Sequence, residues 1–177
     1  MKLASATLRC VAAPTAKAHD VFMGPVGTSW KPGRGLLGPL KPLIGAWIAE
    51  AAGPGPASRM RCTRRFEPTL GGAWVLLRAR WETGPDSAYE ETALFGRGDD
   101  GILGFASFTS DGKQSRGRLA DGSDVHPQAV AFEAQMPAGL ARMIYWPAED
   151  EGFYFAVESR TKKGWNRFMR HHYRRDG

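Results

Sequence analysis

The sequence predicts an all-β domain, an antiparallel up-and-down barrel of about ten strands, from three observations. First, from residue 46 onward, short runs rich in β-branched and aromatic residues alternate with turn residues every 8–15 positions. Second, no segment of this region has the length and the 3.6-residue period of an amphipathic helix. Third, the connections are too short for parallel crossovers. Closing such a meander into a barrel removes its exposed edge strands.

Ten segments fit this pattern, and most breaks between them contain residues that tolerate a positive φ angle. Such breaks occur at residues 71–72, 98–101, 110–112 and 121–122. A β-sandwich is the alternative, but serial hairpins favour the barrel. The expected strands cover residues 46–52, 59–67, 73–82, 88–97, 102–109, 113–120, 128–136, 140–147, 152–160 and 164–174.

A chain of 177 residues has the size of one domain. We expect residues 1–35 to form a poorly structured N-terminal extension and residues 36–177 to form the barrel domain. The apolar segment before the first strand contains two prolines, which predicts a short helical plug or 3₁₀ turn. The first residues do not predict a secretory signal, because Thr7 and Arg9 interrupt their apolar run.

The charge distribution argues against a nucleic-acid binder. The net charge is +6, but residues 1–49 carry +5 of it and the remainder only +1. A nucleic-acid binder concentrates positive charge on its folded surface. The two cysteines, Cys10 and Cys62, form no CxxC or Cys/His cluster, which predicts no metal site and favours a reducing, cytoplasmic setting. No apolar stretch is long enough for a transmembrane helix.

Strand alternation predicts which side chains point into the barrel. In the third expected strand, every second residue from Ala73 to Trp81 is apolar, while two arginines lie on the opposite face. In the ninth, every second residue from Phe153 to Val157 is apolar. These two apolar faces are therefore expected to line the lumen.

Three expected inward faces also carry polar residues. The polar residues are Arg64 on the second expected strand, Glu91 on the fourth, and Arg167 and His171 on the tenth. A charge on an interior face is costly unless it is paired or solvated. These side chains are therefore candidates for orienting a ligand. In the structural alternative, Arg64 pairs with Glu91 across the lumen, or a bulge turns the tenth-strand residues to the outside.

Three short segments resemble a known family. Residues 43–47, LIGAW, resemble the Gly-x-Trp signature that opens the first strand of lipocalin-like (calycin) barrels after a short helical plug. Residues 69–74, TLGGAW, and 167–175, RFMRHHYRR, are similar to a bacterial lipocalin-like family designated DUF1579. The resemblance covers about residues 36–175. It implies mainly a fold, because that family has no agreed activity.

The resemblance also implies roles for residues near the chain end. In lipocalins a basic residue of the last strand packs across the Gly-x-Trp tryptophan, which here implies that Arg167 or Arg170 covers Trp47. Nitrobindin-like barrels bind haem through a histidine of the last strand, and here His171 is the candidate, at a shifted position. Fatty-acid-binding barrels hold a carboxylate with an arginine and a tyrosine near the chain end. Arg167 and Tyr173 are similar in kind but not in spacing.

The leading functional hypothesis is a binding protein that holds a small hydrophobic or amphipathic ligand in its lumen. The alternatives are an isomerase- or hydratase-type enzyme, a haem-binding barrel, and an interaction module whose lumen is filled by its own side chains. Apart from haem we expect no cofactor, and we expect no nucleic-acid partner. Exposed Trp74 and Leu76 would indicate a homodimer. The expected ligand-binding residues are Arg64, Trp81, Glu91, Phe95, Phe155, Trp165, Arg167, His171 and Tyr173.

Overall fold

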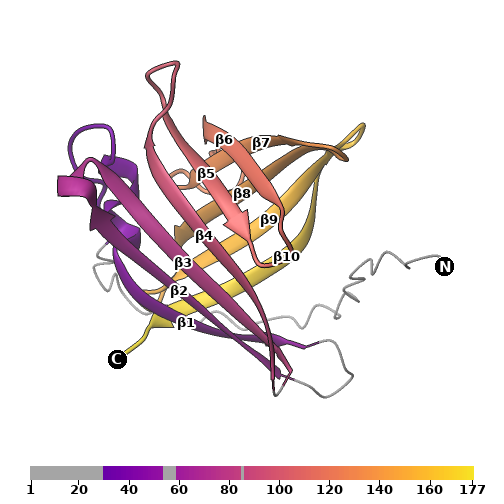
Figure 1. The fold of residues 1–177 in the computed structure, drawn as a ribbon. Coiled ribbons are helices and arrows are strands. Elements are labelled where there is room, and N and C mark those ends of the chain that lie inside the picture. The colour runs from indigo at the N-terminus through magenta and orange to yellow at the C-terminus, as the bar shows by residue number, and fades with distance from the viewer. Residues whose placement is uncertain (1–29, 54–58, 85) are drawn as a thin grey trace.

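The fold is a closed antiparallel β-barrel of ten strands, as the sequence predicts (Figure 1). The computed structural model describes residues 30–53, 59–84 and 86–177. Each strand pairs with its neighbours in sequence, and β1 pairs with β10 to close the ring. The elements are the 3₁₀ turn η1 Gly38–Leu43, β1 Gly45–Ala52, β2 Arg59–Thr69, the 3₁₀ turn η2 Leu70–Gly72, β3 Trp74–Gly84, β4 Ser87–Arg97, β5 Leu103–Thr109, β6 Gln114–Ala120, β7 Val130–Met136, β8 Gly139–Pro147, β9 Phe153–Thr161 and β10 Gly164–Arg175.

The strand boundaries follow the turn residues of the sequence closely. Every strand begins and ends within two residues of its predicted limits. One expected inward residue is wrong: Ala73 follows η2 in the αR conformation and is exposed, so the inward face of β3 begins at Val75. Gly71 and Gly72 provide the φ angles of 68° and 82° that this turn requires, which residues with a Cβ adopt only at a steric cost.

One end of the barrel is filled by aromatic and aliphatic side chains. Both leucines of η1 are fully buried there and belong to the main core. Trp47 at the start of β1 meets Phe153 edge-on, with ring centroids 4.8 Å apart. Trp30 packs on the same phenylalanine and donates its indole N–H to the Gln128 carbonyl at 3.0 Å. This end is therefore closed by packed side chains.

The packed chain begins earlier than the expected domain boundary. Trp30 is already buried, whereas the barrel domain was expected to start at residue 36. Residues 1–29 of the expected N-terminal extension lie outside the described residues.

Arg175 covers the tryptophan of the Gly-x-Trp segment. Its guanidinium carbon lies 3.9 Å from the Trp47 ring centroid. The expectation that Arg167 or Arg170 covers this ring is wrong, because both lie over Trp146 instead, at 5.0 and 5.7 Å. The physical reason is register: β1 and β10 meet where Trp47 is paired with Arg175.

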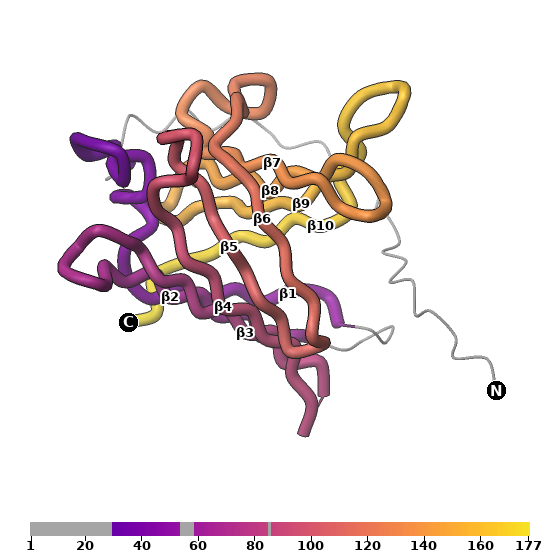
Figure 2. The backbone as a smooth tube through the Cα atoms, turned by 45° about the horizontal axis from the view of Figure 1, so that its top comes forward, coloured from indigo at the N-terminus to yellow at the C-terminus, as the bar shows by residue number. Residues whose placement is uncertain are grey.

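The seam that closes the barrel is short. Pairing between β1 and β10 joins only Trp47 with Arg175 and Ile48 with Arg174. Beyond these residues the two strands diverge toward the other end of the barrel, as Figures 1 and 2 show. That end is therefore the open one.

A β-bulge in β10 changes which side chains face the lumen. The pairing of β10 with β9 shifts at Phe168, which is 50% exposed. After the bulge, His171 and Tyr173 are buried inside the barrel. Before it, Trp165 and Arg167 face outward, because one extra residue inverts the alternation. The expected single inward face from Trp165 to Tyr173 is wrong for this reason.

Candidate functional site

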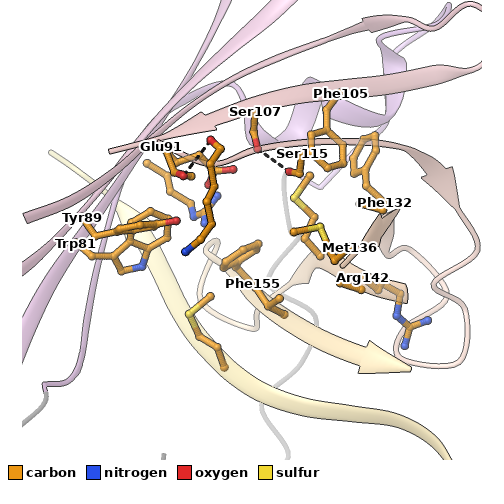
Figure 3. Close-up of a pocket in the computed structure, with 18 of the residues that line it drawn as sticks. Trp81, Tyr89, Glu91, Phe105, Ser107, Ser115, Phe132, Met136, Arg142 and Phe155 are labelled. Carbon is orange, nitrogen blue, oxygen red and sulfur yellow. Dashed lines mark hydrogen bonds between the residues drawn. The ribbon is translucent and has the colours of Figure 1, made fainter. Parts of the chain in front are cut away.

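The barrel encloses a cavity of about 620 Å³ toward its open end (Figure 3). Thr83, Thr109 and Lys113 line it next to the β3–β4 and β5–β6 turns, so they form its rim. The deeper wall is mostly apolar. The volume lies in the range of about 300–1,000 Å³ that is usual for small-molecule sites. The alternative in which side chains fill the lumen therefore does not describe this end of the barrel.

All four methionines that the structure describes line this cavity. Met60 and Met169 come from β2 and β10, whereas Met136 and Met143 come from β7 and β8. Methionine is unbranched and polarizable, so it adapts to apolar ligands of irregular shape. None of the four was expected as a site residue, although a period of two places Met60 on the same face as Arg64 and Met169 on the same face as His171.

Arg64 lies at the floor of the cavity, and its side chain is only 1% exposed. Its guanidinium carbon lies 3.7 Å from the Phe155 ring centroid and 5.1 Å from that of Trp81. The Nη1 atom donates to the Tyr145 hydroxyl at 3.1 Å. Aromatic faces and one hydroxyl therefore surround this charge, and cation–π attraction offsets part of its desolvation.

The Arg64 guanidinium has no carboxylate partner among the described residues. Glu91 lines the same cavity from β4, but it forms neither an ion pair nor a hydrogen bond with Arg64. The structural alternative, in which Arg64 pairs with Glu91 across the lumen, is therefore wrong. Burial disfavours the charge, but Tyr145, Tyr173 and Glu91 raise the pKa of Arg64 above its usual value. The guanidinium is thus a permanent positive charge at the floor.

Five buried side-chain atoms of the described residues lack a hydrogen-bond partner, and they gather around this charge. They are Nε and Nη2 of Arg64, Nε1 of Trp81, the Tyr173 hydroxyl and Nδ1 of His171. Burial and the Arg64 charge lower the pKa of His171 to about 4, so its imidazole is neutral at pH 7. Buried polar groups are normally paired. This cluster is therefore a set of unpaired polar atoms at and behind the floor of the cavity.

Three expected site residues lie inside the barrel but not on the cavity wall. Phe95 is fully buried, with its ring centroid 5.1 Å from that of Phe132. Tyr173 stacks on Phe153 at 5.2 Å, and His171 lies beside Tyr173 at 6.1 Å. These rings pack inside the barrel behind the residues that form the cavity floor. The expected residues that do line the cavity are Arg64, Trp81, Glu91 and Phe155.

Trp165 and Arg167 lie on the outer face, with a second buried arginine, Arg142. The guanidinium of Arg142 points away from the other cavity residues (Figure 3). Its Nε and Nη2 donate to Glu158 at 2.9 and 2.5 Å, and its Nη1 and Nη2 donate to Asp124 at 2.8 and 2.9 Å. Glu158 also accepts a bond of 2.8 Å from Arg167, and the Trp165 ring lies 4.3 Å from the Arg142 guanidinium. Both expected site residues therefore belong to an external ion-pair network.

Wall residues of β5 to β7 were not predicted from the sequence. Phe105 and Phe132 line the cavity, and Ser107 and Ser115 share a hydrogen bond of 2.9 Å across its wall. Period-2 alternation was the available signal. This signal was weak in β7, because both faces of the strand are buried: one faces the lumen, and on the other Ala131 belongs to a small outer core.

The chemical groups of the lumen are a fixed positive charge, hydrogen-bond donors and half-buried Glu91. Burial chiefly raises the pKa of the Cys62 thiol to about 11, so it is protonated at pH 7 and is a poor nucleophile. In the described part of the chain, Glu91 and His171 do not hydrogen-bond to each other, and no three metal-ligating side chains form a cluster. The arrangement is best suited to holding a polar head group.

No protein-family model matches this chain, and no curated protein matches it. Across residues 30–53, 59–84 and 86–177, no helix is long and apolar enough to cross a membrane.

Proposed function

We propose that this barrel binds a small hydrophobic or amphipathic molecule in its lumen, in the manner of the calycin-like barrels that residues 36–175 resemble. The observation that carries the proposal is the cavity of about 620 Å³, whose apolar wall contains a few convergent polar groups. Trp81 and Phe155 offer flat apolar faces, while the methionines adapt to the ligand's shape.

A neutral fluorescent probe, N-phenylnaphthylamine, tests the proposal. We expect it to bind the wild-type protein and to gain fluorescence in the apolar lumen. Ala134→Trp should abolish this signal, because Ala134 is buried on the cavity wall and the indole fills the cavity. Thr92→Trp is the matched control, since Thr92 is exposed on the outside of β4. Absence of binding by the wild type, or equal binding by Ala134→Trp, contradicts the proposal.

Haem binding is a second candidate, and His171 is the observation behind it. Its neutral imidazole lies inside the barrel with Nδ1 unpartnered, which suits a metal ligand, although His171 is not part of the cavity wall. Titration with haemin, followed by the visible absorption of the wild type and of His171→Ala, tests it. A Soret shift that requires His171 supports the candidate, and unchanged spectra exclude it.

Three other expectations stay predictions. These are the cytoplasmic location, the lack of a nucleic-acid partner, and the homodimer. Trp74 and Leu76 do face outward and are half-buried, and Trp74 packs over Gly96 of the neighbouring strand. Analytical ultracentrifugation tests the dimer directly.

A further inference from the structure

The polar groups at the floor of the cavity are almost all hydrogen-bond donors. Nε and Nη2 of Arg64, Nε1 of Trp81 and the hydroxyl of Tyr173 carry hydrogens that no acceptor in the described part of the chain takes up. Tyr173 lies near Arg64 without reaching hydrogen-bond geometry. Unmet donors around a permanent positive charge are complementary to an anion that has several acceptor oxygens.

We propose that the ligand is an organic acid whose carboxylate binds Arg64, with its apolar part directed toward the methionines and the open end. This inference rests on the proposed function and names the head group. A guanidinium donates two parallel N–H bonds to the two oxygens of a carboxylate, and Nε and Nη2 of Arg64, which are buried and have no partner among the described residues, form such an edge. The Trp81 indole, on the cavity wall, provides a further donor beside that edge, and the Tyr173 hydroxyl lies behind it.

The orientation of the acid follows from the order of residues along the strands. In β2 the inward series runs from Met60, near the open end, through Arg64 to Phe66. Phe66 is fully buried and meets the Tyr145 ring edge-on at 5.9 Å, so the space below Arg64 is closed. The hydrocarbon part therefore extends away from Phe66, toward the open end and the methionines that line the cavity.

Glu91 tunes the affinity of the site. Arg64 pairs with Ala79, and Ala79 pairs with Glu91, so the backbones of the two charged residues are about 10 Å apart across the sheet. A carboxylate at Arg64 is repelled by that of Glu91. Glu91→Gln should therefore strengthen binding of the acid. Arg64→Met should instead lower the affinity for the acid to that for a neutral ligand.

The experiment compares decanoate, decanol and decylamine as competitors of N-phenylnaphthylamine at pH 8. For the wild type we expect decanoate to compete about ten-fold or more better than decanol, and decylamine to compete worst, because a hydrogen-bonded charge pair contributes at least this factor. Arg64→Met should still bind the neutral probe but lose the preference for the acid. Glu91→Gln should increase the affinity for decanoate alone.

The wild-type comparison requires no variant, so it remains decisive if Arg64→Met fails to fold. Equal competition by acid and alcohol overturns the head-group inference and leaves the proposed function intact. A preference for decylamine overturns it too, and assigns Glu91 as the anchor. Failure of the neutral probe to bind any form overturns the proposed function and this inference together.

Discussion

Arg64 and Arg142 are 1% and 2% exposed, yet their surroundings differ completely. Arg142, on the outer face of β8, uses Nε, Nη1 and Nη2 to bind Glu158 and Asp124. Arg64, inside the barrel, is surrounded by aromatic rings and one tyrosine hydroxyl, and two of its nitrogens have no partner among the described residues. A buried charge without its counter-ion lowers stability. The difference indicates that Arg142 stabilises the fold, whereas the charge of Arg64 has no counter-ion in the described part of the chain.

Replacing Arg142 should have the largest effect. Arg142→Met leaves Glu158, which is 3% exposed, without its main partner, and breaking a buried pair in this way costs about 3–5 kcal/mol. Urea denaturation measures this loss. Arg160→Met is the matched control, because Arg160 is exposed but contacts the same Trp165 ring. A loss no larger than that of the control would show that the network contributes little.

Lowering the pH should destabilise the folded protein, because His171 is buried in its neutral form. Its pKa is about 4 in the folded protein against 6.5 ordinarily, so the unfolded chain takes up a proton first as the pH falls. The contribution of the neutral imidazole is present above pH 6.5 and is lost toward pH 4, by about 3 kcal/mol at most. Unfolding at pH 7.5 and 4.5 should show this loss in the wild type and in His172→Asn, and a smaller one in His171→Asn.

Arg64→Met should change stability in the opposite direction from Arg142→Met. It removes an unpaired buried charge and leaves a side chain of similar length, so we expect a gain of about 1 kcal/mol in urea denaturation without ligand. The pKa of His171 should also rise, because the Arg64 charge helps to lower it. An NMR titration of the imidazole measures that shift. A marked loss of stability would mean that Arg64 is itself a structural residue.

The smallest effect is expected at Trp165. Trp165→Leu removes the ring that lies 4.3 Å from the Arg142 guanidinium but keeps every ion pair, so the loss should be about 0.5–1 kcal/mol. Binding of the neutral probe should not change, since Trp165 lies outside the barrel. Phe168→Ser serves as the control at the exposed bulge and should be close to neutral. Reduced probe binding by Trp165→Leu would contradict the external placement.

Strand positions and most inward faces were predictable because they depend on local pattern. Turn residues located all ten strands, and alternation placed Arg64, Trp81, Glu91 and Phe155 on the cavity wall. The same reasoning failed for Trp165 and Arg167. A one-residue bulge leaves no clear mark in the sequence, yet it inverts every side chain on one side of it.

The sequence by itself determined an antiparallel ten-stranded meander and the inward direction of an arginine on β2, because both follow from turn chemistry and a period of two. Only the tertiary structure decided that no carboxylate of the described residues pairs with Arg64, that two pair with Arg142, and that Arg175 covers Trp47. These facts depend on distances between strands that are far apart in the chain. The curvature and register of the closed barrel set those distances, and a single-strand pattern does not encode them.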